Sequence, residues 1–315
     1  MQKILPMTMK SAKVNLAGSR FLSYLACLLA ILLWSGWIVL SRHGAQTTLS
    51  AIDLSFVRFT TALVCSIPLW FVYNWRRIPI HQLLLVSWSA GVLYTTFCFA
   101  GMVTAKAATA GVLINGLLPV FGAVIGYLWN RTKISTLTGV CILSILLADA
   151  MLIGGDWQKL GNPQGIMAIL LFACASLFFS FYAVAVKKWN VRLMDIVVWI
   201  PIINFITILP FWLGSDTGIP AASLTEVLLQ AIFQGVVVTL FAGFLIAHTI
   251  KTLGPMTSTM FMASVPGITA LLGYIVLQEP LSSIEAISVV ICMAALMINS
   301  RYGMRTFRTK NNFLK

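Results

Sequence analysis

The chain contains 315 residues, of which 59% are hydrophobic and only 9% are charged, and its formal net charge is +13. A soluble globular domain carries roughly 25% charged residues, so this composition excludes a soluble protein. The basic residues lie in short groups between long apolar runs rather than in one continuous patch. This distribution argues against a nucleic-acid-binding protein and is typical of a membrane protein whose charges set its orientation.

Ten apolar runs follow one another along the chain. Each is long enough to cross a bilayer as a helix, because about 20 residues at 1.5 Å per residue span a hydrocarbon core of about 30 Å. We expect spans near residues 21–40, 54–73, 83–103, 108–129, 136–153, 165–186, 194–213, 227–250, 256–277 and 284–300. A β-barrel is excluded because the runs are continuously apolar and do not alternate. The predicted fold class is therefore an all-α polytopic membrane protein.

The positions of the basic residues predict the orientation of the chain. If the N-terminus is cytoplasmic, almost all lysines and arginines outside the spans fall in cytoplasmic segments, and the outer segments contain only Arg42, Lys106 and Lys159. Positive charge concentrates on the cytoplasmic side of membrane proteins. We therefore expect a multi-pass protein of the bacterial inner (plasma) membrane. Both termini should be cytoplasmic, with basic tails at residues 1–20 and 303–315.

The chain aligns with itself, which indicates an internal duplication. Residues 117–135 align with residues 264–282, and residues 51–70 align with residues 193–212. The matched pairs are Pro119 and Pro266, Gly126 and Gly273, Ser135 and Ser282, Asp53 and Asp195, and Trp70 and Trp212. We expect two repeats of five helices, at residues 21–155 and 156–302. They must enter the membrane from opposite sides because five is odd, and inverted repeats are typical of secondary transporters.

Several motifs add a resemblance to a known family. The first span contains "WSG", the second contains "FVRF", and "KTLGPMTST" precedes a helix reading "SVPGITALLGYIVLQEPLS". Over about residues 20–302 the chain resembles the drug/metabolite transporter superfamily, specifically an EamA-type ten-helix transporter. The resemblance implies export of amino acids, related metabolites or drugs through a central cavity formed by both repeats.

The two copies of the last motif end in opposite charges. Members of the family often carry an acidic residue at this point in both copies, but the first copy here has Arg131, Thr132 and Lys133, and the second has Glu279. Because the copies are inverted, these ends lie on opposite sides of the membrane. We interpret Glu279 as an orientation mark on the outer side rather than as a functional acid.

The sequence contains no constellation that would support catalysis. Its three histidines are far apart, its six cysteines fall inside apolar runs without CxxC spacing, and it has no glycine-rich phosphate-binding loop. We therefore expect no enzymatic activity, no cofactor, no metal and no direct use of ATP.

Two charged residues, Arg58 and Asp149, lie well inside the spans, where charge is costly. Arg58 could meet an anionic group of the substrate, or it could snorkel outward or pair with Asp53 or Asp149. Asp149 is the only acid well inside a span and is the candidate for proton coupling, although it could equally be a solvated residue at the membrane interface. The first span carries no acid, so a neutral or zwitterionic solute fits better than a cationic drug.

Polar and aromatic side chains at intermediate depth complete the candidate substrate site. Each could line a cavity or could simply pack and hydrogen-bond between helices. The candidates besides Arg58 are Trp34, Trp37, Tyr94, Asn115, Tyr182, Trp199, Asn204 and Gln234.

Small residues and prolines predict features of helix packing. Gly122 and Gly126 in the fourth span, and Thr269 and Gly273 at the aligned positions of the ninth, have the spacing that allows close helix approach. We expect these two spans to pack against each other. Prolines lacking a backbone hydrogen bond should kink their helices. The predicted kinks are at Pro68, Pro119, Pro210 and Pro266.

These observations favour a secondary transporter, in the exporting direction, of small organic metabolites such as amino acids, working by alternating access between the inverted repeats. The alternatives are a membrane solute sensor or scaffold that does not transport and, among transporters, a drug/proton antiporter or a metabolite exchanger. The expected partners are a small-molecule substrate and the lipid bilayer, with no nucleic acid. We expect a monomer or a weak homodimer.

Overall fold

A computed structural model describes residues 16–75, 78–131, 134–155, 158 and 161–303. Most of the two expected basic tails, together with Thr132, Lys133 and Lys159, lies outside these ranges. All regular secondary structure within them is helical. The elements are α1 (Leu16–Ala45), α2 (Ala51–Trp70), α3 (Ile80–Ala90), α4 (Val92–Met102), α5 (Ala107–Asn130), α6 (Thr136–Gly155), α8 (Pro163–Lys188), α9 (Leu193–Leu213), η1 (Ile219–Ala221), α10 (Leu224–Gln230), η2 (Ala231–Ala242), α11 (Gly243–Leu253), α12 (Pro255–Met262), α13 (Val265–Leu277), α14 (Ser283–Ile298) and η3 (Asn299–Gly303).

The described residues form ten helical segments that are long and apolar enough to cross a membrane, as the sequence predicts. Polar caps explain where several of them begin. Ser50 and Asp53 form a capping box at the start of α2, and Ser282 and Glu285 form another at the start of α14. Each box satisfies backbone N–H groups that have no partner within the helix. The first span extends to Ala45, beyond the predicted end at residue 40.

Three of the ten spans depart from the regular α-helix in their interior, and the tenth ends in the short π-helix η3. The third is interrupted at Gly91, between α3 and α4. The eighth contains a long π-helical stretch, η2, between α10 and α11. The ninth is interrupted between α12 and α13, and Pro266 lies in the first turn of α13. A proline in a first turn removes no helical hydrogen bond, so Pro266 marks the start of a helix and not a kink within one.

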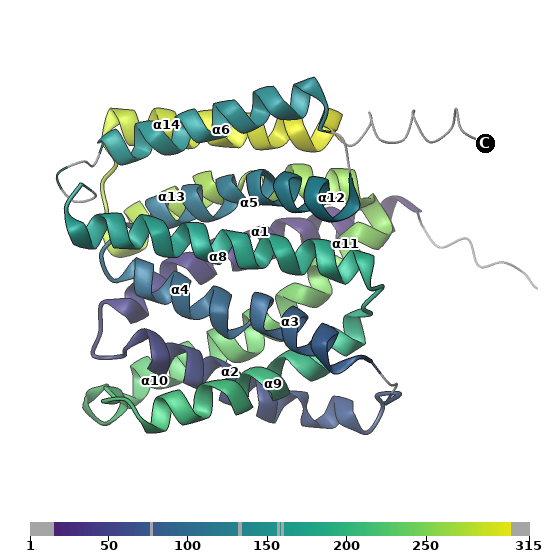
Figure 1. The fold of residues 1–315 in the computed structure, drawn as a ribbon, viewed down its shortest axis with the longest axis vertical. Coiled ribbons are helices and arrows are strands. Elements are labelled where there is room, and N and C mark those ends of the chain that lie inside the picture. Colours follow the sequence, from purple (N-terminus) through teal and green to yellow (C-terminus); the bar gives the residue numbers. More distant parts are fainter. Residues whose placement is uncertain (1–15, 76–77, 132–133, 156–157, 159–160, 304–315) are drawn as a thin grey trace, which may run out of the picture.

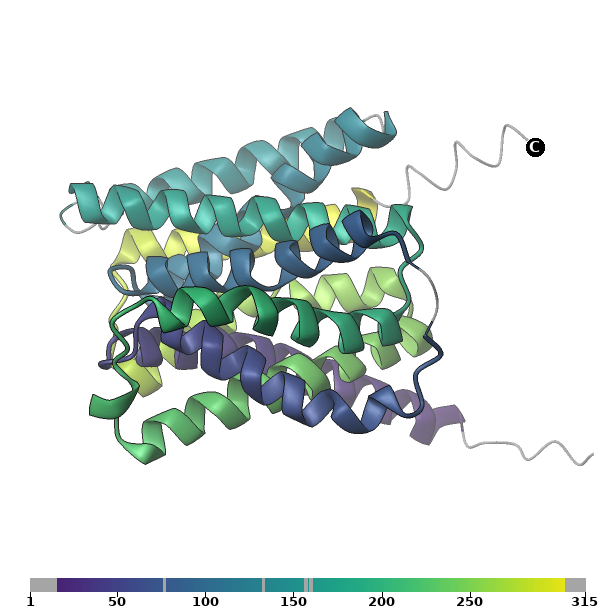
Figure 2. The ribbon, with the colours of Figure 1, turned by 60° about the horizontal axis from the view of Figure 1, so that its bottom comes forward.

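The two repeats lie in the membrane in opposite senses. The helices run roughly parallel to one another, and α1 begins at the same end of the bundle at which η3 finishes (Figures 1 and 2). We call this the near end and the other the far end. Five crossings carry the chain from the near end to the far end, where α8 begins the second repeat. The helices α2 and α9 pack against each other, as do α5 and α13, and α6 and α14.

The contact between α5 and α13 corrects one expectation. These helices do pack together, but an added Cβ at Gly122 would meet no neighbour within 4 Å. The close approach is at the beginning of α5, where a Cβ at Gly111 would lie 3.1 Å from the Thr269 side chain and one at Gly273 would lie 3.3 Å from Ala107. The spacing of small residues therefore predicted the contact residues of α13 correctly. On α5 the contact is made instead by the turns before Gly122.

Ion pairs join the two repeats at the far end. Arg42 at the end of α1 pairs with Glu279 after α13 at 2.9 Å, and their side chains are only 10% and 12% exposed. The Arg42 guanidinium also donates to the carbonyl groups of Met102 and Val103 at the end of α4. The second Glu279 oxygen accepts from the Ala107 backbone N–H, 2.8 Å away, at the start of α5. Glu279 is therefore not merely an orientation mark: it connects helices of both repeats.

The paired helices α2 and α9 are joined reciprocally at both ends. At the far end, the Asp53 carboxylate accepts from Trp212 Nε1 at 3.0 Å and from Thr217 Oγ1 at 2.6 Å, both beyond or near the end of α9. At the near end, Asp195 of α9 accepts from the Tyr73 hydroxyl at 2.7 Å, just beyond α2. Asp53 and Asp195 are the aligned pair predicted by the internal repeat, and their contacts follow its inverted symmetry.

Candidate functional site

A buried polar cluster joins α1, α2 and η2 in the interior of the bundle. Trp37 Nε1 and Arg58 Nη1 both donate to the Gln234 side-chain oxygen, at 2.6 Å and 2.9 Å. Arg58 lies about two turns into α2, roughly 10 Å from its first residue at 1.5 Å per residue. All three side chains are buried. Because α1 and α2 belong to the first repeat and η2 to the second, the cluster lies between the repeats.

Gln234 is the centre of this cluster. Its side-chain nitrogen donates to Ser41 Oγ at 2.9 Å and to the Gln230 side-chain oxygen at 3.1 Å. The amide therefore makes four hydrogen bonds, two through each of its ends, which is the arrangement that offsets the cost of burying a polar group. Its orientation is set by α1, α2 and α10 together, so the Arg58 guanidinium is held by a fixed partner.

Aromatic rings form a continuous wall beside Arg58. Trp37 stacks on Tyr94, with ring centroids 5.5 Å apart, and Tyr94 contacts Phe179 at 4.8 Å. Phe179 in turn contacts Trp34 at 6.2 Å and Tyr182 at 5.3 Å. A pocket for a small organic molecule is typically mostly aromatic and apolar, with a few fixed polar groups. The wall and the polar cluster together have this composition.

The charge of Arg58 has no acidic partner among the described residues. It neither pairs with Asp53 or Asp149 nor reaches the exterior, so the expectations of snorkelling or pairing are wrong. The guanidinium carbon lies 5.8 Å from the centroid of Trp37, within the range of a cation–π interaction. Its Nε atom is buried without a hydrogen-bond partner, and so is Trp34 Nε1. These two donors are therefore unsatisfied in this conformation.

The structure brings together six of the predicted substrate-site residues and leaves the others elsewhere. The cluster and its wall contain Trp34, Trp37, Arg58, Tyr94, Tyr182 and Gln234. Sequence reasoning missed Ser41, Gln230 and Phe179. A polar residue near one end of a span was the available signal for the first two, Ser41 in the last turns of the first span and Gln230 in the first turns of the eighth. Phe179 is one of many phenylalanines in apolar runs and gave no signal.

The Asn204 side chain bonds to the backbone on both sides of the break in the third span. Its side-chain oxygen accepts from the Val92 backbone N–H at 2.7 Å, and its nitrogen donates to the carbonyl groups of Ser87 and Ile200 at 2.9 Å and 2.8 Å. A Cβ at Gly91 would lie only 2.1 Å from the Asn204 nitrogen. Of the two predicted roles for this amide, the structure shows the hydrogen bond between helices. Asn204 replaces backbone bonds that the interruption of the helix removes.

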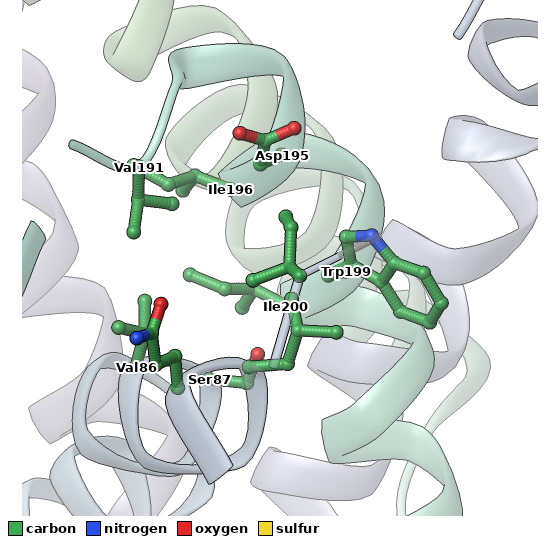
Figure 3. A pocket seen from close by; sticks show the side chains of 10 residues that line it. Val86, Ser87, Val191, Asp195, Ile196, Trp199 and Ile200 are labelled. Carbon is green, nitrogen blue, oxygen red and sulfur yellow. The ribbon is translucent and has the colours of Figure 1, made fainter. Parts of the chain in front are cut away.

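Trp199 lies toward the near end, away from the central cluster. Its Nε1 donates to the Tyr73 hydroxyl at 3.2 Å, and its ring meets Trp75 edge-on. It also lines a small pocket between α3 and α9, with Asp195 and Ser87 among the other lining residues (Figure 3). This pocket is separate from the Arg58 cluster, so Trp199 does not contribute to the aromatic wall.

Asp149 and Asn115 lie on α6 and α5, outside the cluster. Asp149 is buried rather than solvated at the interface, which corrects one of its two expected settings, and neither carboxylate oxygen has a hydrogen-bond partner. It lies close to Gly116, where a Cβ would be 3.2 Å from the carboxylate. Asn115 donates to the Gly111 carbonyl of its own helix at 2.7 Å. Within the described part of the chain, no group of three or more His, Cys, Asp or Glu residues is arranged to hold a metal.

Comparison with known proteins adds the family and the fold. The family model described as "EamA-like transporter family" matches residues 21–154 and 166–301. A solved structure titled "Crystal structure of protein" is similar, with a TM-score of 0.63 and 17% sequence identity, over 91% of this chain and 99% of that chain. At this identity the likeness extends to the fold alone. No curated protein matches the chain.

Proposed function

The chain belongs to the EamA-like transporter family, and we propose that it is a secondary transporter that exports small organic metabolites, such as amino acids or related solutes, across the bacterial inner membrane. Family membership makes it a multi-pass membrane transporter. The proposal adds the substrate, the direction and the mechanism. The expected cytoplasmic location of the near end belongs to the proposal as well.

The observation that carries the proposal is the buried, unpaired guanidinium of Arg58 between the two repeats. A charged side chain at the centre of a membrane helix costs about 2.5–3.5 kcal/mol on insertion scales, and here no acidic side chain among the described residues offsets it. Such a residue is retained where it contributes to function. The aromatic wall beside it supplies the apolar surface that the carbon skeleton of a metabolite requires.

Alternating access is supported by a difference between the two ends of the bundle. At the far end, α4 packs against α1 and α2, and Ser55 of α2 hydrogen-bonds with Thr96 of α4 at 2.8 Å. In the second repeat, α11 corresponds to α4, and α8 and α9 correspond to α1 and α2. Among the described residues, α11 makes no extensive contact with α8 or α9. The far end therefore has contacts at this position that have no counterpart at the near end among the described residues. If α4 separated from α1 and α2 while α11 packed against α8 and α9, the far end would open and the near end would close.

Transport is tested by reconstitution into liposomes with a panel of labelled amino acids and related metabolites. We expect saturable flux of at least one solute, reduced at least roughly tenfold in Arg58→Gln, which is the effect of losing about 1.4 kcal/mol of binding. Arg301→Gln is the matched control, because Arg301 is exposed at the near end. The absence of saturable flux for every solute would refute the proposal, and unchanged flux in Arg58→Gln would refute the assigned site.

Proton-driven antiport is a second candidate, favoured by one observation. Asp149 is buried without a hydrogen-bond partner, and a carboxyl group in such a setting can exchange a proton as its surroundings change. If it couples transport to protons, an imposed pH gradient drives flux in the wild type and has no effect in Asp149→Asn. Flux that ignores the gradient in both proteins would instead support facilitation or solute exchange.

A solute sensor that does not transport would contain a similar binding site. It is distinguished from a transporter by binding without flux: a solute that stabilises the purified protein, yet is not carried by it in liposomes, would favour the sensor. The difference between the contacts of α4 and those of α11 argues for transport, because a sensor has no need of two ends that differ in this way.

A further inference from the structure

We propose that Arg58 binds the carboxylate of the transported solute through two parallel hydrogen bonds, and that Gln234 is the positioning residue that presents the guanidinium for this contact. The inference rests on the proposed function, since it names the chemical class of solute at the same site. It also assigns to Gln234 a role other than direct contact with the solute.

The free edge of the guanidinium is the basis of the proposal. Arg58 donates through Nη1 to Gln234, while neither Nε nor Nη2 makes a hydrogen bond within the described residues. The N–H groups of Nε and Nη2 point side by side along one edge of the planar group. Their spacing matches the two oxygens of a carboxylate, which arginine binds in a bidentate manner. The partner that this edge requires is therefore a planar anion.

Gln234 determines the direction in which this edge points. Its oxygen accepts from Arg58 Nη1 on the side opposite the free edge, and it also accepts from Trp37. The bonds from its nitrogen to Ser41 and Gln230 prevent the amide from turning. Gln234 is neutral, so it fixes the guanidinium without neutralising it. A glutamate at this position would have the same shape but would take up the positive charge.

The surroundings favour a monocarboxylate with an apolar body. The other arginine buried near α4, Arg42, is already paired with Glu279, so Arg58 is the single cation facing the cluster among the described residues. One cation balances one negative charge, whereas a phosphate dianion would leave a charge unbalanced in a site of low polarity. The Trp37 ring lies beside the guanidinium, and the rings of Tyr94, Phe179 and Trp34 continue from it through ring-to-ring contacts. Trp34 Nε1 provides a further unpartnered donor.

The proposal is tested by binding to the full-length protein in nanodiscs, measured as stabilisation against heat. The probes are matched pairs of a monocarboxylate and its neutral amide: phenylpropionate with phenylpropionamide, and 4-methylpentanoate with 4-methylpentanamide. We expect at least one acid to stabilise the wild type and its amide to bind at least roughly tenfold more weakly, which corresponds to the loss of one charge-assisted hydrogen bond of about 1.5 kcal/mol. Equal stabilisation by acid and amide, or no stabilisation by any acid, would overturn the proposal.

Variants separate charge, geometry and positioning. Arg58→Lys keeps the charge but removes the planar fork, and we expect it to lose most of the preference for the acid over the amide. Gln234→Leu should reduce this preference roughly tenfold, and Gln234→Glu should abolish acid binding while leaving the protein folded. Gln82→Leu, in the separate pocket between α3 and α9, is the matched control and should keep the wild-type preference.

Each result has a distinct meaning for the two proposals. If the Gln234 variants kept the wild-type preference for acids, Gln234 would have no positioning role. Saturable flux of a solute without a carboxylate, together with no acid binding, would refute the carboxylate site and leave the transporter proposal intact. Acid binding that depends on Arg58 without flux of any solute would support the site and refute transport.

Discussion

Replacement of Asn204 by leucine should destabilise the protein more than replacement of Asn115 by leucine. Asn204 bonds to the Val92 N–H and the Ser87 carbonyl at the break around Gly91, at 2.7 Å and 2.9 Å. Leucine has a similar volume but can form neither bond. The perturbation therefore leaves one backbone donor and one backbone acceptor without their partner in the interior of the bundle.

The magnitude follows from these two groups. A hydrogen bond between membrane helices contributes about 0.6 kcal/mol on average, which sets a lower limit of about 1 kcal/mol for the pair. A buried backbone group left unpaired costs about 1–3 kcal/mol, which gives about 2–6 kcal/mol for two. We expect a loss of about 2–4 kcal/mol, because the helix can relax partly around the break.

The assay is reversible unfolding in mixed micelles with increasing SDS, followed by circular dichroism. Asn115→Leu is the matched control, since Asn115 donates only to Gly111 of its own helix and should lose less than about 1 kcal/mol. Gly91→Ala should be destabilising as well, because its Cβ would meet the Asn204 amide at 2.1 Å. A loss below about 0.5 kcal/mol for Asn204→Leu, or equal losses for both asparagines, would refute the reasoning.

Three further predictions concern other contacts. Glu279→Gln breaks the ion pair with Arg42 and should loosen the far end. Cys98, which is fully buried on α4, should then react at least several-fold faster with a water-soluble maleimide, as measured by mass spectrometry. An unchanged reaction rate would show that the pair does not hold the helices together at this end. Gly111→Val should destabilise by about 1–3 kcal/mol in the SDS assay through overpacking against α13, and Gly122→Val, which faces open space, should not. Burial, followed by the hydrogen bond to the Asp195 carboxylate, raises the pKa of the Tyr73 hydroxyl above the ordinary 10.0. The neutral hydroxyl therefore contributes fully to stability below pH 10, and this contribution is lost as the pH rises through the higher pKa of the folded state. The unfolding free energy, measured against pH in the SDS assay, should lose this alkaline decline in Tyr73→Phe.

The number of the spans and the division of the chain into two repeats could be predicted from the sequence. Residues 136–155 illustrate why: crossing a bilayer requires only enough consecutive apolar residues, which is a local property of the chain. The capping pairs at Ser50 and Ser282 are equally local, since each box involves residues three apart. The interruption of the third span at Gly91 was not predicted, because a glycine within an apolar run does not reveal that an asparagine far along the chain replaces the lost bonds.

The sequence by itself determined the class of the protein, its ten helices and the opposed orientation of its two repeats, because these depend on apolar length, charge distribution and an odd number of crossings. Only the tertiary structure decided which polar side chains meet. The spans are apolar on all sides, so no amphipathic pattern specifies how each helix is rotated. Rotation and packing bring Arg58 to Gln234, place Glu279 against Arg42 and leave Trp199 at the near end. These contacts join residues more than one hundred positions apart, and the one between Arg58 and Gln234 defines the candidate site.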